Sequence, residues 1–230
     1  MVFDLDDTLY LERDFVRSGF RAASTWFERE TGTAGLEALC IELFEAGQRT
    51  QIFDAALEAL GVGGGDAVAR LVEIYRSHAP DIALAADAER YLRRRAAGRR
   101  YALITDGPEA TQMAKVQALG LERLLDEVIC TGAWGRDFWK PHPRAFEVIE
   151  ARSGGRGAEV AYIADNPGKD FVTPRARGWW TVQIARPERV HHVPAPDAEH
   201  EAHAIIASLD ALDDCLADLL AAGPDEPAGG

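Results

Sequence analysis

Short runs of apolar residues recur along the chain, and each run ends abruptly at a small or acidic residue. They lie at residues 2–3, 101–104, 127–130, 160–164 and 179–184. Apolar residues at consecutive positions over so short a length are typical of strands buried on both faces of a parallel sheet. Segments with helical spacing of apolar residues lie between them, at residues 87–97, 110–119 and 143–152. This alternation of strands and helices predicts a doubly wound α/β fold.

One long segment, residues 11–80, breaks the alternation. It contains no strand-like run, but its apolar residues recur at helical spacing, for example Leu39 with Leu43, and Phe53 with Leu57. We therefore expect an insert of several helices between the first and second strands. The predicted organisation is a core formed by residues 1–10 and 81–222, a helical insert at 11–80, and a flexible Pro/Gly-rich tail at 223–230.

Charge and composition exclude several classes of function. The chain carries 25 basic and 38 acidic residues, a net charge of −13, so it is not expected to bind nucleic acid. No apolar run approaches the ~18 residues of a membrane span, and the amino-terminal residues do not resemble a secretion signal. The three cysteines are far apart and lack CxxC spacing, which predicts a reduced, cytoplasmic protein. The sequence does not indicate an oligomeric state.

Polar and charged residues follow the predicted strands at the ends where ligands bind in a doubly wound sheet. The first strand leads into Asp4, Asp6 and Thr8, the second into Thr105, Asp106 and Gly107, and the fourth into Asp165 and Asp170. Lys140 lies in the loop after the third strand. Carboxylates gathered at one edge repel one another unless a cation lies among them, and donors that are all oxygen atoms favour a hard metal. The sequence therefore predicts a Mg²⁺ site.

These residues, in this order, resemble the four motifs of the haloacid dehalogenase (HAD) superfamily of aspartate-nucleophile phosphohydrolases. The motifs are Asp-x-Asp-x-Thr at residues 4–8, an apolar strand ending at Thr105, the single Lys140, and the acidic pair Asp165 and Asp170. The resemblance extends from residue 4 to residue 170. It implies a Rossmann-like parallel-sheet core, and the helical insert resembles the C1-type cap of that family.

The resemblance also implies roles for the acidic residues. Asp4 would be the nucleophile that forms an aspartyl phosphate. Mg²⁺ would be held by Asp4, the backbone carbonyl of Asp6, and Asp165. Asp6 would protonate the leaving alkoxide and then accept a proton from water.

The remaining motif residues would bind phosphate or support the site. Lys140 and the Thr105 hydroxyl, with the backbone N–H groups of Asp106 and Gly107, would bind the phosphoryl oxygens. Asp170 would orient Lys140 or a metal-bound water, and Thr8 is a further supporting residue.

Asp6 also separates reactions within the superfamily, because the dehalogenase and phosphonatase branches lack a carboxylate two residues after the nucleophile. Its presence predicts a Mg²⁺-dependent phosphomonoester hydrolase that acts on a small soluble phosphorylated metabolite. One alternative is a phosphomutase of the same superfamily, which would transfer the phosphoryl group between sugar hydroxyls. Another is a phospho-acceptor signalling module, against which the helical insert and the first-strand position of Asp4 argue.

Some features depart from the family pattern. Ala164 stands where glycine usually precedes the first acid of the fourth motif, and Asp106 stands where asparagine is frequent. Only three residues precede Asp4, fewer than a central strand of ~5–6 residues needs, so we expect further apolar residues upstream.

Two arginines of the insert are candidate substrate contacts. Arg13 and Arg17 are four residues apart, which places them on one face of the first predicted helix of the insert. There they would either contact an anionic substrate or pair with Glu12 and Asp14 on a solvated face.

Overall fold

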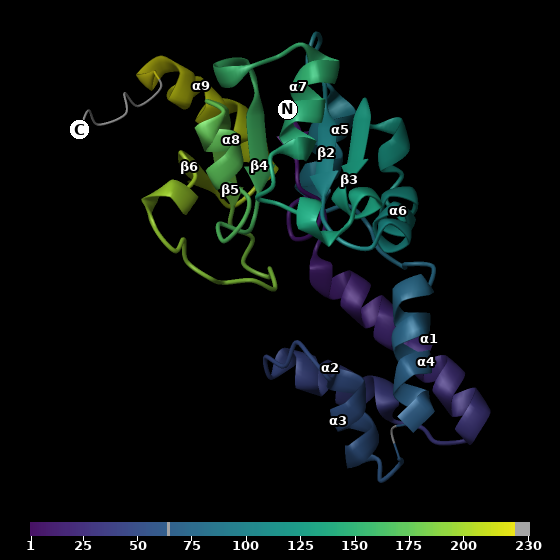
Figure 1. Cartoon of the computed structure of the whole chain (residues 1–230). Helices are drawn as coiled ribbons and strands as arrows, with labels where there is room; N and C mark the ends of the chain where they lie inside the picture. Colours follow the sequence, from purple (N-terminus) through teal and green to yellow (C-terminus); the bar gives the residue numbers. More distant parts are fainter. Residues whose placement is uncertain (64, 224–230) are drawn as a thin grey trace. The chain divides into compact units, whose positions relative to one another are not determined.

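The structure is a computed structural model that describes residues 1–63 and 65–223. The chain forms two compact units (Figure 1), of which the first comprises Met1–Glu12 and Ala83–Gly230 and the second comprises Arg13–Ile82. The tail predicted at 223–230 lies outside the described residues, apart from Gly223. Among the helices of the described ranges, none is both long enough and apolar enough to cross a membrane.

The first unit is built around a parallel sheet. In the described part of the chain the sheet has six strands, in the order β3-β2-β1-β4-β5-β6. The strands are β1 Val2–Phe3, β2 Ala102–Thr105, β3 Glu127–Cys130, β4 Ala161–Ala164, β5 Trp180–Ile184 and β6 Ala204–Ile206. Every neighbouring pair is parallel, which confirms the predicted doubly wound, Rossmann-like α/β fold.

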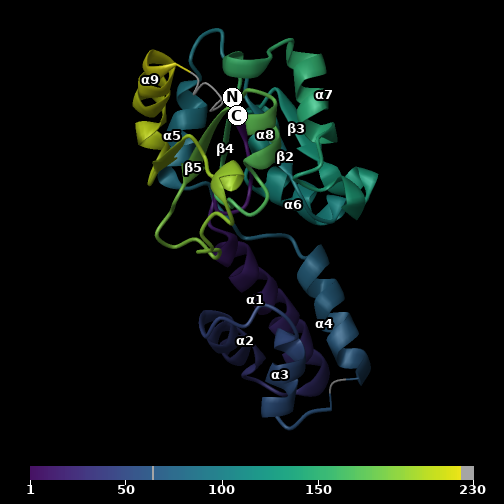
Figure 2. The same cartoon turned by 60° about the vertical axis from the view of Figure 1, so that its left-hand side comes forward.

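Helices cover both faces of this sheet (Figure 2). Neighbouring residues of a strand point to opposite faces, so each strand packs against helices on both sides. Val2 packs with Phe146 of α7 (Arg144–Ser153), whereas the ring of Phe3 lies 6.1 Å from that of Tyr91 in α5 (Ala86–Arg94). Both faces are therefore buried, which explains why the strands appear in the sequence as uninterrupted apolar runs. The other helices of this unit are α6 Glu109–Ala118, α8 Val172–Ala176 and α9 Leu212–Ala222. Short 3₁₀ segments lie at Leu121–Arg123, Thr131–Trp134, Arg136–Phe138, Gly157–Glu159, Ala198–His200 and Leu209–Ala211.

The sequence pattern does not predict the sixth strand, β6. This strand has three residues and lies at the edge of the sheet, where it pairs with β5 alone. Its central residue, Ile205, is 67% exposed. An edge strand this short has too few alternating positions to show a strand pattern in the sequence.

The second unit, Arg13–Ile82, is helical, and its bounds differ by two residues at each end from the predicted insert at 11–80. Its helices in the described residues are α1 Glu12–Thr31, α2 Leu36–Glu45, α3 Ile52–Ala59 and α4 Gly65–Ser77, with Glu12 itself belonging to the first unit. Aromatic rings form its core, since the Phe20 ring lies 5.7 Å from Phe53 and 5.6 Å from Tyr75. A Cβ atom on Gly19 would lie 2.5 Å from the Tyr75 ring, so glycine is needed where α1 and α4 meet.

The loop between β1 and α1, which carries the first motif, is held in place by Arg186. The guanidinium group, on a residue only 7% exposed, donates to the Thr8 carbonyl at 2.8 and 3.1 Å and to the Asp87 carboxylate at 3.0 and 3.1 Å. The Leu209 N–H also donates to Asp87, at 2.7 Å. Burial disfavours ionisation of Asp87, but these hydrogen bonds outweigh it and lower the pKa of the carboxyl group. Arg186 therefore links the motif loop to the sheet.

Loss of Arg186 should destabilise the fold, because it leaves the Asp87 carboxylate and the Thr8 carbonyl buried without their partner. We expect Arg186→Ala to lower the free energy of unfolding by about 3 kcal/mol, measured by urea denaturation. Arg90→Ala is the matched control: Arg90 pairs with Asp210 and is 61% exposed, so its loss should lower stability far less than the loss of Arg186. Equal losses in the two variants would contradict the assigned role of Arg186.

Candidate active site

Three strands bring the predicted site residues to one edge of the sheet, because β1 lies between β2 and β4. Asp4 follows β1, Thr105 ends β2, and Asp165 follows β4. The Asp4 N–H donates to the Ile163 carbonyl at 2.9 Å, which keeps β1 in register with β4 as far as Asp4. A cavity of about 340 Å³ lies here. It is lined by Asp4, Asp6, Glu12, Asp106, Trp139, Lys140, Asp165, Asn166, Lys169 and His191.

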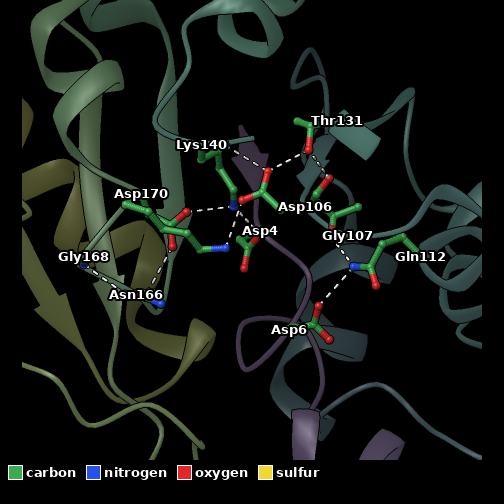
Figure 3. Close-up of polar contacts among 12 residues, drawn as sticks. Asp4, Asp6, Asp106, Gly107, Gln112, Thr131, Lys140, Asn166, Gly168 and Asp170 are labelled. Atoms are coloured by element: carbon green, nitrogen blue, oxygen red, sulfur yellow. Dashed lines mark hydrogen bonds and ion pairs between the residues drawn. The ribbon is translucent and has the colours of Figure 1, made fainter. Parts of the chain in front are cut away.

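The Lys140 ammonium group joins two buried carboxylates (Figure 3). Its Nζ lies 2.5 Å from Asp4 Oδ1 and 2.7 Å from Asp170 Oδ1, and it donates to the Tyr162 hydroxyl at 2.9 Å. Burial disfavours the charged ammonium, but Asp170 and Asp4 outweigh it and raise the pKa of Lys140. Within the described residues the ammonium group donates to Asp4 and Tyr162, and Asp170 completes the ion pair. Lys140 therefore neutralises the Asp4 carboxylate.

Asp4, Asp165 and Asp170 form an acidic cluster. Each offers a carboxylate oxygen, and these oxygens lie within 4.8 Å of one another. The Asp170 carboxylate already pairs with Lys140 and accepts the Asn166 N–H at 3.2 Å. The Asp165 carboxylate, by contrast, accepts no hydrogen bond from any described residue.

The electrostatics of this cluster fit a divalent cation. Burial, followed by repulsion from Asp4 and Asp170, raises the pKa of Asp165 to about 9. Burial also raises the pKa of Asp4 to about 6, against the opposing effect of Lys140. Buried carboxylates that resist ionisation, with oxygen atoms as their only donors, are suited to Mg²⁺.

Asp6 is held by three side chains. Oδ1 lies 2.7 Å from Lys115 Nζ and accepts the Tyr10 hydroxyl, and Oδ2 accepts Gln112 Nε2 at 3.1 Å. Gln112 and Lys115 are three residues apart on α6 and so lie on one face of that helix. Burial disfavours the ionised form of Asp6, but Lys115 and the hydrogen bonds outweigh it and lower the pKa. Asp6 is therefore ionised in this site.

Asp106 is neutralised within the site. Its Oδ1 accepts the Thr131 hydroxyl at 2.7 Å and the Lys140 N–H at 3.1 Å, and its Oδ2 lies 3.0 Å from Lys169 Nζ. Burial opposes ionisation, but Lys140, Lys169 and the hydrogen bonds outweigh it and lower the pKa of Asp106. The acid that stands where asparagine is frequent is thus paired with a lysine.

Thr105 and Gly107 have defined surroundings on β2 and the loop after it. Thr105 is 1% exposed, and its hydroxyl accepts Gln112 Nε2 at 2.5 Å, so Gln112 bridges Thr105 and Asp6. Gly107 adopts a φ of 135°, and a Cβ atom there would lie 3.1 Å from the Gln112 side chain. Both the backbone conformation and the neighbouring side chain therefore require glycine.

Six predicted residues do not line the cavity as described, namely Thr8, Arg13, Arg17, Thr105, Gly107 and Asp170. The Thr8 hydroxyl is buried and has no hydrogen-bond partner among the described residues, while its carbonyl binds Arg186. Arg13 and Arg17 belong to the second unit, where both pair with Glu45, at 3.2 and 2.9 Å. Glu45 thus takes the place of the acidic partners expected from the sequence, Glu12 and Asp14.

Sequence reasoning missed Tyr10, Gln112, Lys115 and Lys169, yet the composition contains a signal for two of them. Of the 25 basic residues, only three are lysines: Lys115, Lys140 and Lys169. Each lysine pairs with a site carboxylate, namely Asp6, Asp4 and Asp106 respectively. In a chain whose other basic residues are arginines, the few lysines mark the site.

The fold and the site define an α/β protein with acidic residues at the carboxyl edge of a parallel sheet. The chain belongs to the family of haloacid dehalogenase-like hydrolases, which matches residues 1–172, and this confirms the predicted family.

Individual relatives agree with this assignment. The chain is 33% identical over 162 residues to phosphoserine phosphatase from Thermus thermophilus, covering 68% of this chain but only 62% of that protein. It is 28% identical over 195 residues to glyceraldehyde 3-phosphate phosphatase from Methanocaldococcus jannaschii, covering 81% of this chain and 84% of that one. Among solved structures, the magnesium-bound HAD-hydrolase YfnB from Bacillus subtilis matches with a TM-score of 0.66 over 94% of this chain and 96% of that one. Its 17% identity shows the shared fold alone.

The raised pKa of Asp165 makes the stability of the metal-free protein depend on pH. The folded state keeps a proton on Asp165 up to about pH 9, whereas the unfolded chain releases it near the ordinary value of 3.8. Because the folded state binds more protons in this interval, stability falls as pH rises through it. In EDTA we expect Tm to fall between about pH 5 and pH 9, and to fall less steeply in Asp165→Asn.

The matched control for this measurement is Asp214→Asn, at an exposed position of α9, which should keep the wild-type slope of Tm against pH. A slope in Asp165→Asn as steep as that of wild type would show that Asp165 ionises without penalty.

Proposed function

We propose that the protein is a Mg²⁺-dependent phosphomonoester hydrolase that acts on a small phosphorylated metabolite through an aspartyl-phosphate intermediate. The observation that carries this proposal is the environment of Asp4. One carboxylate oxygen pairs with the buried Lys140 at 2.5 Å, and the unpaired Asp165 carboxylate lines the same cavity. The names of the two relatives, both phosphatases of small phosphate esters, support the same reaction class.

The reaction takes place in two displacements at phosphorus. First, an Asp4 oxygen attacks phosphorus and the bond to the ester oxygen breaks, so the phosphoryl group passes to the carboxylate and the alcohol leaves. Then water attacks the phosphorus of the aspartyl phosphate, which releases inorganic phosphate and restores Asp4. Asp4, the Asp6 carbonyl and Asp165 would hold Mg²⁺, whose charge offsets the repulsion between carboxylate and phosphate.

Groups at the end of β2 would bind the phosphoryl oxygens. The Thr105 hydroxyl, which accepts a hydrogen bond from Gln112, keeps its own hydrogen for donation. The backbone N–H groups of Asp106 and Gly107 are the other proposed donors.

Asp6 is proposed to transfer protons in both steps. Its ionised carboxylate is ready to accept a proton from the attacking water, whereas donation to the leaving alkoxide requires that it first gain a proton. Tyr10, Gln112 and Lys115 hold it in one position for both tasks. A carboxylate here favours phosphate esters over carbon–halogen bonds, because halide leaves without a proton.

The second unit is proposed to be a C1-type cap that selects the substrate, with Arg13 and Arg17 as candidate contacts. Phosphoserine and glyceraldehyde 3-phosphate, for which the relatives are named, are the first substrates to test.

All three cysteines are free, which supports the predicted cytoplasmic location.

Phosphate release from p-nitrophenyl phosphate tests the central role of Asp4. We expect turnover that requires Mg²⁺, is lost in EDTA, and falls by at least about 10³-fold in Asp4→Asn. Asp214→Asn should retain wild-type turnover. Unchanged turnover in Asp4→Asn would overturn the mechanism.

The same assay separates the alternatives. A phosphomutase would convert a hexose 1-phosphate to its isomer without releasing inorganic phosphate. A phospho-acceptor module would accumulate a long-lived phospho-aspartate and turn over no ester.

A second experiment tests Asp6. p-Nitrophenolate leaves without a proton, so Asp6→Asn should still form the aspartyl phosphate but hydrolyse it slowly. We expect a burst of about one p-nitrophenol per enzyme, followed by a steady rate reduced by about 10²- to 10⁴-fold. Stopped-flow absorbance measures the burst, and circular dichroism checks that the variant is folded. A wild-type steady rate without a burst would exclude Asp6 from proton transfer.

A further inference from the structure

The cavity contains a further lysine, Lys169, to which the mechanism proposed above gives no role. The Lys140 side chain is fully buried, donates to Asp4 and to the Tyr162 hydroxyl, and lies 2.7 Å from Asp170. Lys115 is 6% exposed and pairs with Asp6. Both of these ammonium groups already take part in buried ion pairs.

Lys169 differs from the other two lysines. Its side chain is 34% exposed and lines the cavity, and in the described part of the chain its Nζ has one carboxylate partner, Asp106 at 3.0 Å. One donor is therefore used, and two remain for another acceptor. A lysine with free donors, in a cavity that also contains Asp4, is placed to bind an oxyanion.

Asp106 fixes the position of this lysine. Its other oxygen is held by the Thr131 hydroxyl and the Lys140 N–H (Figure 3). The Asp106 side chain is 5% exposed. The carboxylate therefore has little freedom to move, and Lys169 Nζ is anchored to a rigid group at the cavity wall. A long lysine side chain anchored in this way loses less entropy when it binds a ligand.

The negative charge of the cavity means that a phosphate group needs a cationic partner there, and Lys169 can supply it. Carboxylates of Asp4, Asp6, Asp106 and Asp165 line the cavity together with Lys140 and Lys169. A phosphate group entering it meets predominantly negative side chains. An ammonium group is a compact charge with several rotatable donors, well suited to phosphate oxygens.

We propose that Lys169 binds the phosphate group of the substrate directly and that Asp106 positions it. This inference rests on the proposed function. It adds a phosphate-binding lysine, located between the two acids of the fourth motif, and it explains why an acid at position 106 is tolerated beside an anionic substrate.

Kinetics of Lys169 variants test the proposal. Because p-nitrophenyl phosphate and inorganic phosphate carry no second anionic group, they report on the phosphate contact alone. In Lys169→Met we expect KM for the ester and the inhibition constant of inorganic phosphate to rise together by about 10- to 100-fold, because one charge-assisted hydrogen bond is lost. The change in kcat should be smaller. Lys169→Arg should recover most of the affinity.

Arg90→Met is the matched control, because it lowers the net charge of −13 by the same single charge at an exposed position and should leave both constants unchanged. An inhibition constant that is unchanged in Lys169→Met, with wild-type turnover intact, would overturn the role of Lys169 and leave the phosphatase assignment standing.

Chemical labelling tests the contact between Lys169 and phosphate independently of turnover. An amine-reactive acetylating reagent should modify Lys169 before Lys115 and Lys140, and Mg²⁺ with inorganic phosphate should protect it, as read by peptide mass spectrometry. Absence of protection in a protein that phosphate inhibits would refute the contact. If the wild type turned over no phosphate ester, the proposed function would fall, while protection of Lys169 would still establish the phosphate contact.

Discussion

Buried carboxylates at the edge of a sheet stay ionised only when positive charge lies among them, and this requirement organises the site. Five acids, Asp4, Asp6, Asp106, Asp165 and Asp170, meet three ammonium groups in the described residues, and Asp165 is the acid without a lysine partner. The deficit of two positive charges is the charge of one divalent cation. Glu12 changes this balance little near neutral pH, because burial and repulsion by Asp6 raise its pKa to about 8.

The backbone holds these charges together through contacts that take no part in the chemistry. β1 has two residues, so the position of Asp4 depends on its neighbours and on the loop that follows. In that loop Asp7 has a φ of 52°, and its carboxylate accepts the Glu12 N–H at 2.9 Å and the Val190 N–H at 2.6 Å. Asp7 thus starts α1 and ties the loop to the segment after β5, beside the anchor that Arg186 provides. A loop fixed at several points keeps Asp4 and Asp6 in place despite their mutual repulsion.

The sequence predicts the sheet and most motif residues well because three of the four motifs lie directly at the end of an apolar run. Asp4, Thr105 and Asp165 are of this kind, and strand order alone brings them together. The sequence pattern does not predict the edge strand β6, because β6 pairs with a strand on one side only and its other side faces solvent. The partners of Asp6 are not predicted for another reason. Helical spacing shows that Gln112 and Lys115 share a face of α6, but it does not show which distant polar group that face contacts. For Lys115, only the scarcity of lysine in the sequence indicates a contact with the site.

All the residues that line the described cavity belong to the first unit, as do the groups proposed to transfer the phosphoryl group. The groups assigned to the reaction recognise a phosphate and a departing oxygen, and these are common to every phosphate ester. They contain nothing that distinguishes one alcohol from another. Selection of the substrate must therefore come from residues other than Asp4, Asp6, Lys140 and Asp165. The helical unit has its own aromatic core, so its surface residues can change without disturbing the charge balance on which the chemistry depends.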